Sequence, residues 1–261
     1  MRFFSPAKVN LFFRVLRKRS DGYHEIASLY QAIDLGDWIT FCPSDHDELT
    51  CSPPTLPCDE TNLISKARAL FRTHINLPPV HIHLEKQIPM QAGLGGGSSN
   101  AATTLWALNQ LTNTPLSTEQ LMTLGSFLGS DVPFFFSSGT AFCTGRGEII
   151  APFSLSPVQG MVEKPPYGLS TPEVYRNVRV DKLPLTDVEE VLRSFRDGHL
   201  HLFNDLEYSA FQLEPRLRAF KEELLSQFKT VSMTGSGTAF FCLSDQGTIR
   251  SIQRTASTWY Q

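Results

Sequence analysis

Four glycines stand among residues 93–97, the stretch named here the glycine loop, and Ser98, Ser99 and Asn100 follow it directly. Glycine lets consecutive backbone N–H groups turn toward one point, and the start of a helix adds unpaired N–H groups and partial positive charge, so the loop could hold phosphate. It is not a Walker A sequence, because no Gly-Lys-Ser or Gly-Lys-Thr occurs, and Ser98 replaces the third glycine of a dinucleotide fingerprint. A flexible turn is the alternative interpretation.

Lys8 and Asp131 could supply the other parts of a phosphoryl-transfer site. Asp131 precedes the aromatic run at residues 134–136, where Pro133 restricts the backbone and apolar neighbours would limit the access of water. A carboxylate there could accept a substrate proton, and Lys8 could stabilise the charge of a transferred phosphoryl group. Taken singly, such an aspartate is more often a turn or capping residue, and such a lysine a surface residue.

Local sequence patterns predict how these residues are positioned. Residues 3–15 alternate as in a strand, which places Lys8 and Asn10 on the same face. Residues 80–85 also alternate between apolar and polar, and after the glycine loop leucines and alanine recur at helical spacing through residues 101–111. The order of strand, glycine loop and helix presents the loop at a helix N-terminus.

The remaining patterns predict further elements on both sides of one proline-rich segment. We expect a strand at 23–34, a loop at 51–58, helices at 62–73, 117–128 and 215–228, and strands at 231–233 and 239–243 around a glycine turn at 234–238. Residues 151–166 are either a connection between domains or a strand pair with loops. We place the boundary there, with domains at 1–152 and 153–261.

The composition excludes several classes of protein. With 261 residues, 41% hydrophobic, 19% charged, and 17 each of Gly and Pro, the chain is neither collagen-like nor disordered. The net charge of -3 argues against a globally basic nucleic-acid binder. Five cysteines without a Cys-x-x-Cys pair suit a reducing compartment. We expect no signal peptide, because Pro6 and Lys8 interrupt the apolar residues near the start, and no apolar run approaches membrane-spanning length.

Three stretches together resemble the motifs of the GHMP kinase superfamily, which includes galactokinase and homoserine, mevalonate and phosphomevalonate kinases. They are residues 6–11 near the start, 89–101 in the middle and 234–239 near the end, in family order. Asp-Gly-Tyr-His at 21–24 and Ser-Asp-Val-Pro at 130–133 are similar to one branch of the superfamily, whose substrate is a CDP-linked methylerythritol.

The resemblance implies an α+β fold, in which an amino-terminal domain like the second domain of ribosomal protein S5 is joined to a ferredoxin-like carboxy-terminal domain. The active site is expected in the cleft between them. The implied activity is ATP-dependent phosphorylation of the 2-hydroxyl of the CDP-linked methylerythritol, in the non-mevalonate (MEP) route to isoprenoids. We expect a cytoplasmic monomer or weak dimer without nucleic-acid or membrane partners.

The resemblance also assigns roles to individual residues. Asp131 matches the catalytic aspartate and Lys8 the lysine beside it. Tyr23 and Tyr175 are expected on either side of cytosine, with His24 at its polar edge. The substrate-binding set is completed by Asn10, Tyr30 and Thr171. The ATP site is expected to comprise Asn62 near adenine, and Pro89, Met90, Gln91, Ala92, Gly93, Leu94, Gly95, Gly96, Gly97, Ser98 and Ser99 around the phosphates. Mg²⁺ is expected to bridge the phosphates, and no residue is assigned as its ligand.

Two other functions compete with this one. A superfamily kinase for homoserine or a mevalonate derivative would have no use for stacking tyrosines, because its acceptor carries no base. A non-catalytic RNA-binding or regulatory protein with the S5-like fold predicts a broad basic face and dispensable Lys8 and Asp131. The net charge of -3 disfavours that reading, although residues 1–24 carry six basic side chains and one acidic one.

Overall fold

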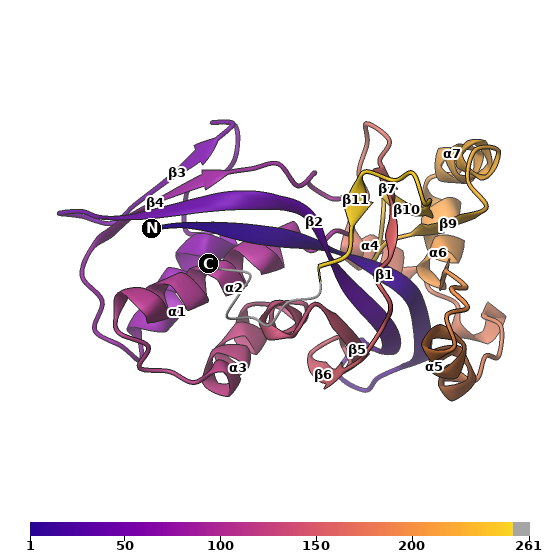
Figure 1. Ribbon diagram of the computed structural model, residues 1–261, viewed down its shortest axis with the longest axis horizontal. Coiled ribbons are helices and arrows are strands. Elements are labelled where there is room, and N and C mark those ends of the chain that lie inside the picture. Colours follow the sequence, from indigo (N-terminus) through magenta and orange to yellow (C-terminus); the bar gives the residue numbers. More distant parts are fainter. Residues whose placement is uncertain (253–261) are drawn as a thin grey trace.

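The computed structural model describes residues 1–252, which form two β-sheets with helices packed on them (Figure 1). The first half of the chain contains β1 (Arg2–Lys18), β2 (His24–Pro43), β3 (Glu48–Ser52), α1 (Leu63–Arg72), β4 (Val80–Glu85), α2 (Gly96–Leu111), α3 (Thr118–Leu128), the 3₁₀ helix η1 (Pro133–Phe136), β5 (Thr140–Gly145) and β6 (Ile149–Pro152). The second half contains β7 (Gln159–Glu163), α4 (Thr171–Arg176), the 3₁₀ helix η2 (Val180–Lys182), α5 (Val188–Arg196), β8 (Phe203–Asn204), α6 (Leu206–Leu213), α7 (Arg216–Leu225), β9 (Thr230–Met233), β10 (Phe240–Leu243) and β11 (Ile249–Arg250).

The long hairpin of β1 and β2 is the centre of the larger sheet. This sheet has the order β3-β4-β2-β1-β8, and β5 pairs with β2 and with β6. Lys8 lies opposite Ala32 and Asn10 opposite Tyr30, and the register shifts between Asn10 and Phe12. Because β2 is long, its carboxy-terminal part pairs with β4 while its amino-terminal part pairs with β5.

Helices α1, α2 and α3 cover one face of the larger sheet (Figure 1). The side chain of Asn62 caps α1 by accepting a hydrogen bond from the backbone N–H of Ile64, at 2.9 Å. A reciprocal capping box between Ser117 and Gln120 begins α3. These helices bury their apolar side chains with those of β4 and η1 in one core cluster. Within residues 1–252, none of the helices has the length and apolar character needed to cross a bilayer.

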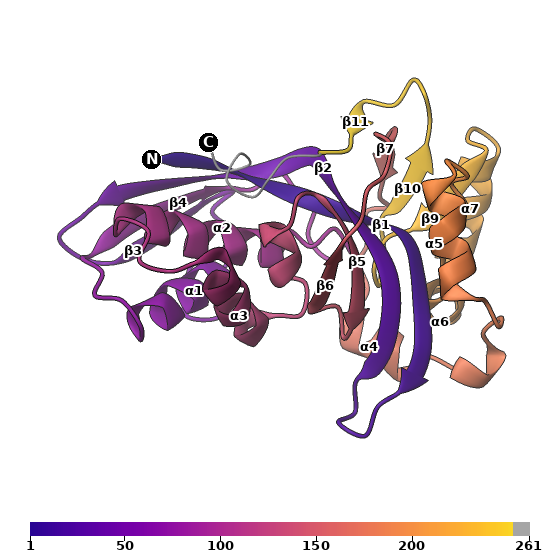
Figure 2. The same cartoon turned by 60° about the horizontal axis from the view of Figure 1, so that its bottom comes forward.

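The smaller sheet has the order β11-β7-β10-β9 and is antiparallel throughout. The bent end of the β1–β2 hairpin reaches toward this half of the molecule (Figure 2), and its Phe13, Val15 and Ile26 share a core cluster with Val174 of α4 and Leu206 of α6. Tertiary packing therefore joins the two halves along the hairpin.

Two features complicate the predicted domain boundary. β6 ends at Pro152 in the larger sheet and β7 begins at Gln159 in the smaller one, yet β8 from the second half pairs with β1. The boundary between residues 152 and 153 therefore stays a prediction, and residues 253–261 of the second predicted domain lie outside the described residues.

Most predicted elements are present, including the strands at 3–15 and 80–85 and the helix after the glycine loop. The loop predicted at residues 51–58 is wrong at its start, because Cys51 and Ser52 belong to β3. That strand pairs in parallel with β4, with Cys51 opposite Leu84. This pairing partner lies 33 positions away in the sequence, beyond the reach of a local pattern.

Candidate active site

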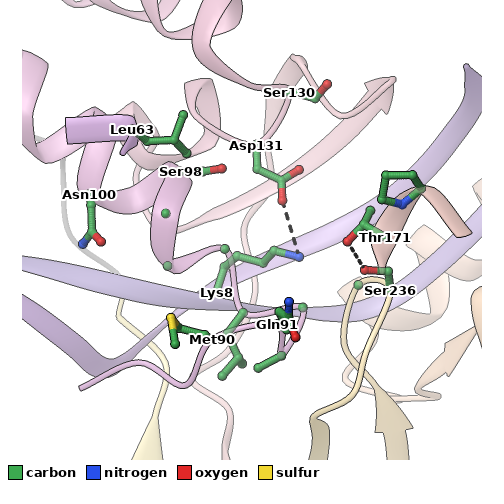
Figure 3. A pocket seen from close by; sticks show the side chains of 18 of the residues that line it. Lys8, Leu63, Met90, Gln91, Ser98, Asn100, Ser130, Asp131, Thr171 and Ser236 are labelled. Carbon is green, nitrogen blue, oxygen red and sulfur yellow. Dashed lines mark hydrogen bonds and ion pairs between the residues drawn. The ribbon is translucent and has the colours of Figure 1, made fainter. Parts of the chain in front are cut away.

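A cavity of about 900 Å³ is lined by the glycine loop, the β1–β2 hairpin, the turn before η1 and the start of α4. All of the predicted site residues except Asn10 and Ser99 line it. Figure 3 shows Lys8 and Asp131 pointing toward one another across this cavity, with Ser98 on one side and Thr171 on the other. Segments from both halves of the chain thus enclose one space.

Lys8 from β1 and Asp131 from the turn before η1 form an ion pair. Nζ of Lys8 lies 3.8 Å from Oδ2 of Asp131, and the side chains are 2% and 30% exposed. Burial lowers the pKa of Lys8, while the charge of Asp131 acts in the opposite direction. Lys8 is therefore not the surface lysine that its residue type alone would favour, and the carboxylate is the more open member of the pair.

Asn10 holds Lys8 and does not line the cavity, and its expected contact with substrate stays a prediction. Its side chain is wholly buried, and its Oδ1 accepts a hydrogen bond from Nζ of Lys8 at 2.7 Å. The same oxygen accepts hydrogen bonds from the hydroxyl of Thr234 at 3.2 Å and from the backbone N–H of Gly235 at 2.8 Å. Oδ1 of Asn10 therefore faces protein donors from β1 and from the turn at residues 234–238.

Tyr30 lies beneath the ion pair on β2. Its hydroxyl donates to Oδ1 of Asp131 at 3.1 Å, and Nζ of Lys8 lies 4.7 Å from the centre of its ring. Burial, reinforced by the charge of Asp131, raises the pKa of Tyr30 well above its usual value. Tyr30 therefore remains a hydrogen-bond donor that orients the carboxylate.

The glycine loop approaches both Lys8 and the turn at 234–238. Gly93 and Gly95 have φ of 72° and 68°, the left-handed region that favours glycine. A Cβ on Gly93 would lie 1.9 Å from the carbonyl oxygen of Thr234, and one on Gly95 would lie 3.0 Å from Cγ of Lys8. The first helical hydrogen bond of α2 runs from Ser99 N to Gly95 O, so the preceding N–H groups are available to an anion.

Ser99 is the second predicted site residue that does not line the cavity. Its hydroxyl is buried and pairs with that of Ser5 at 2.8 Å. Asn100 donates to the same Ser5 oxygen at 3.0 Å and to Oδ2 of Asp37 at 2.8 Å. In this structure Ser99 therefore anchors α2 to β1, and Ser98 is the serine that faces the cavity.

Asn62 and Lys86 lie on the cavity wall beyond the glycine loop. Besides capping α1, Asn62 donates from Nδ2 to the carbonyl of Pro57 at 2.7 Å, which fixes the neighbouring loop. Lys86 pairs with the fully buried Asp37, its Nζ lying 2.6 Å from Oδ2. Burial lowers the pKa of Lys86, and the charge of Asp37 opposes that change. This part of the cavity therefore has a fixed cation and a rigid edge.

Three rings line the opposite part of the cavity. The rings of His24 and Tyr175 are 5.5 Å apart and tilted by 31°, whereas Tyr23 is 54% exposed, with the guanidinium of Arg146 4.9 Å from its ring centre. Burial, and then the nearby charge of Lys18, lowers the pKa of His24. The hydroxyls of Thr171 and Ser236 pair at 2.7 Å beside them (Figure 3).

Comparison with known proteins places the chain among kinases. Residues 62–139 match the family model of the GHMP kinases N terminal domain, and residues 181–261 match that of the GHMP kinases C terminal. A protein of Protochlamydia amoebophila named 4-diphosphocytidyl-2-C-methyl-D-erythritol kinase is 50% identical, over 100% of this chain and 93% of its own length. The chain belongs to the GHMP kinase family.

Solved structures agree with this assignment. A crystal structure of 4-(cytidine 5'-diphospho)-2C-methyl-D-erythritol kinase matches this GHMP kinase with a TM-score of 0.80 and 38% identity, over 94% of this chain and 90% of that one. Homoserine kinase from Cytophaga hutchinsonii has a TM-score of 0.68 at 19% identity, over 99% and 87% of the two chains, and shares the fold. The predicted α+β GHMP kinase fold is confirmed.

Several cavity residues of this GHMP kinase were missed from the sequence. They are chiefly cations and turn residues: Lys18, Lys86, Arg146, Arg176, Gly235 and Ser236. Arg146 had a usable signal, because it stands between Gly145 and Gly147, both with positive φ. Nothing in the local sequence distinguishes Arg176 from a solvent-exposed arginine.

The described part of this GHMP kinase contains no protein-only metal site. Within residues 1–252, no three side chains of His, Cys, Asp or Glu form a group that could hold a metal ion. Mg²⁺ commonly keeps several waters and binds through substrate phosphates with few protein ligands. The residues present therefore fit a Mg²⁺ ion carried by a nucleotide and do not fit a resident structural metal.

Proposed function

We propose that this GHMP kinase transfers the γ-phosphoryl group of ATP to the 2-hydroxyl of 4-diphosphocytidyl-2-C-methyl-D-erythritol, a step of the MEP route to isoprenoid precursors. The substrate is inferred from the similar kinases described above, which are named for it. The observation that carries the chemistry is the pair of Lys8 and Asp131, 3.8 Å apart in the same cavity as the glycine loop. A phosphate cradle, a cation and a carboxylate are the parts that phosphoryl transfer requires.

The reaction would occur at the reacting end of the cavity, defined as Lys8, Asn10, Tyr30 and Asp131. The acceptor oxygen forms a bond to the γ-phosphorus, the bond from that phosphorus to the β–γ bridging oxygen breaks, and ADP leaves. The hydroxyl proton passes to the carboxylate of Asp131, which Tyr30 orients from the other oxygen. Lys8 offsets the negative charge that spreads over the transferred group.

Specificity would arise at the base end of the cavity, defined as Tyr23, His24 and Tyr175. Cytosine would stack on the two tyrosine rings, of which Tyr175 is already held against His24. Because its pKa is lowered, His24 is neutral near pH 7 and offers one donor and one acceptor nitrogen to the polar edge of a base. An acceptor without a base would leave these rings unused.

We propose that ATP brings Mg²⁺ into the site. Ser98, at the start of α2, is the hydroxyl that would contact the ion beside the phosphates, since Ser99 is engaged with Ser5. When bound, the ion would neutralise part of the charge of the phosphates. The backbone N–H groups at the start of α2 and the side chain of Lys8 orient the phosphates.

We also propose that the protein acts in the cytoplasm as a monomer or weak dimer, without a nucleic-acid or membrane partner. All five cysteines are free thiols, which suits a reducing compartment. ATP and the cytidylated acceptor would be its small-molecule partners.

An acceptor-dependent assay tests the proposed function. Purified protein with Mg-ATP should release ADP when the cytidylated methylerythritol is added, and homoserine and phosphomevalonate should give no release above background. Asp131→Asn should lower kcat by about 100- to 10,000-fold at unchanged circular dichroism, because a positioned base is lost. Robust turnover of homoserine or phosphomevalonate alone would show that the protein is a different kinase of the family. Full activity of Asp131→Asn would contradict the proposed role of Asp131 as the base.

A further inference from the structure

We propose that Thr234 is a positioning residue, which aligns Lys8 for phosphoryl transfer by holding the side chain of Asn10. This inference rests on the proposed function, since Lys8 is taken as the cation at the reacting end. Thr234 does not line the cavity and lies at the far end of the chain, after β9.

The position of the Lys8 ammonium depends on one hydrogen bond. Within residues 1–252, Nζ of Lys8 hydrogen bonds only to Oδ1 of Asn10, at 2.7 Å, and Asp131 lies farther away at 3.8 Å. A lysine side chain has four rotatable carbon–carbon bonds and a compact charge, so its direction must be imposed by its partners. The orientation of the Asn10 carboxamide therefore determines where the ammonium points.

The Asn10 carboxamide is in turn held at both ends. Oδ1 accepts hydrogen bonds from the hydroxyl of Thr234 and from the backbone N–H of Gly235. Nδ2 donates a hydrogen bond to Oγ of Ser28 at 2.9 Å. The hydroxyl of Ser28 in turn donates a hydrogen bond to the carbonyl of Phe12. Exchanging the amide nitrogen and oxygen would place the NH₂ group against three donors, so only one orientation satisfies these groups.

Thr234 connects Asn10 to the glycine loop as well. Its Oγ1 accepts the backbone N–H of Asn10 at 3.2 Å, and its hydroxyl proton can be donated to Oδ1 of Asn10 at 3.2 Å or to the carbonyl of Gly93 at 3.1 Å. The residue is wholly buried. One hydroxyl thus links the strand that carries Lys8 to the loop proposed to carry the phosphates.

Backbone contacts fix the turn at residues 234–238 against the glycine loop and the segment before it. Thr238 N donates to Gln91 O, and Ala239 N to Ala92 O, both at 3.2 Å. At Gly235 an added Cβ would lie 3.4 Å from Nζ of Lys8, so a glycine lets the turn approach the ammonium closely. The turn is therefore a rigid support from which Thr234, which does not itself line the cavity, acts on the reacting end.

The test compares Thr234→Val, which replaces the hydroxyl with a methyl group of similar size, with Thr234→Ser, which keeps the hydroxyl. We expect Thr234→Val to lower kcat by about 10-fold while the KM for ATP and for the acceptor changes by less than about twofold, because the loss is in alignment and not in binding. Thr234→Ser should restore kcat to within about threefold of wild type.

Thr238→Val is the matched control. Thr238 is buried in the same turn, but its hydroxyl donates to the carbonyl of Tyr167 at 2.7 Å, away from Lys8. This variant should lose a comparable amount of thermal stability and keep kcat within about twofold. An equal loss of kcat in Thr238→Val, or full kcat in Thr234→Val, would overturn the proposal.

Two further measurements keep the proposal testable if Thr234→Val does not fold or if the proposed acceptor is not the substrate. If Thr234→Val does not fold, Ser28→Ala loosens the other end of the same carboxamide and should lower kcat about threefold without changing either KM; unchanged kcat there would count against the proposal. Activities are compared with wild type on whichever acceptor the wild type phosphorylates, so an error in the proposed substrate changes the acceptor and not the comparison. A crystal structure of the variant needs no substrate, and an intact hydrogen bond between Lys8 and Asn10 in it would also overturn the inference.

Discussion

The reacting end and the base end of the cavity differ in how far they are assembled before any ligand binds. Lys8, Asn10 and Tyr30 are buried, and hydrogen bonds or close contacts join them to one another and to Asp131. At the base end, Tyr23 is half exposed. Groups held in place before the reaction lower the barrier without reorganising, whereas rings open to solvent can adjust to a ligand. The difference predicts that changes at the reacting end lower kcat and that changes at the base end raise KM.

Lys8→Met gives the largest expected effect, and it tests directly whether the reacting end controls kcat. The substitution keeps an unbranched side chain of similar length and removes the cation beside Asp131, so kcat should fall by roughly 100- to 1,000-fold. The KM for the cytidylated acceptor should change by less than about threefold. Steady-state kinetics would measure both, with circular dichroism as a control for folding. A large rise in KM at normal kcat would mean that Lys8 binds substrate and takes little part in the transfer.

Tyr175→Ala tests the base end. Stacking on an aromatic ring contributes about 1–3 kcal/mol per base, so the KM for the cytidylated acceptor should rise by about 5- to 150-fold with kcat largely kept. Tyr175→Phe retains the ring and is the matched control, for which KM should stay within about threefold of wild type. If the two variants raise KM equally, the hydroxyl and not the ring carries the interaction.

Tyr30→Phe tests the reacting end more finely, because it removes one hydrogen bond and leaves the ring beneath Lys8. Losing the 3.1 Å donor to Asp131 should lower kcat by about fivefold, which corresponds to a net contribution of about 1 kcal/mol. Single-turnover rates would separate this loss from effects on product release. A change confined to KM would place Tyr30 with the base end.

The pH dependence of acceptor use gives the smallest expected effect. Burial and the charge of Lys18 lower the pKa of His24, so His24 is neutral at pH 7 and becomes protonated only below its usual value of about 6.5. Removing that charge in Lys18→Gln should raise the pKa of His24, so the acid-side fall of kcat/KM should begin at a higher pH. Arg17→Gln, at a side chain 74% exposed, is the control and should leave the profile unchanged. A shift in the opposite direction would exclude His24 as the group that titrates.

Much of the site was accessible from short sequence patterns, for a physical reason. A phosphate loop is a continuous stretch whose glycines and following helix are neighbours in the chain, and its position between β4 and α2 could be predicted from alternation and helical spacing. The buried hydrogen bonds of Asn10 could not be predicted, because they come from donors more than 220 positions away. Lys86 was missed because a single cation has no distinctive neighbours in sequence.

The family, the glycine loop and the residue types at both ends of the cavity can be recognised from the amino-acid sequence, because they depend on short motifs and their order along the chain. The packed chain, in contrast, shows that Lys8 is buried, that Asn10 and Ser99 face protein groups, and that the turn at 234–238 lies against the lysine. Burial and hydrogen-bond partners arise when distant segments pack together. The same packing joins β1, the glycine loop and the carboxy-terminal turn into one reacting end.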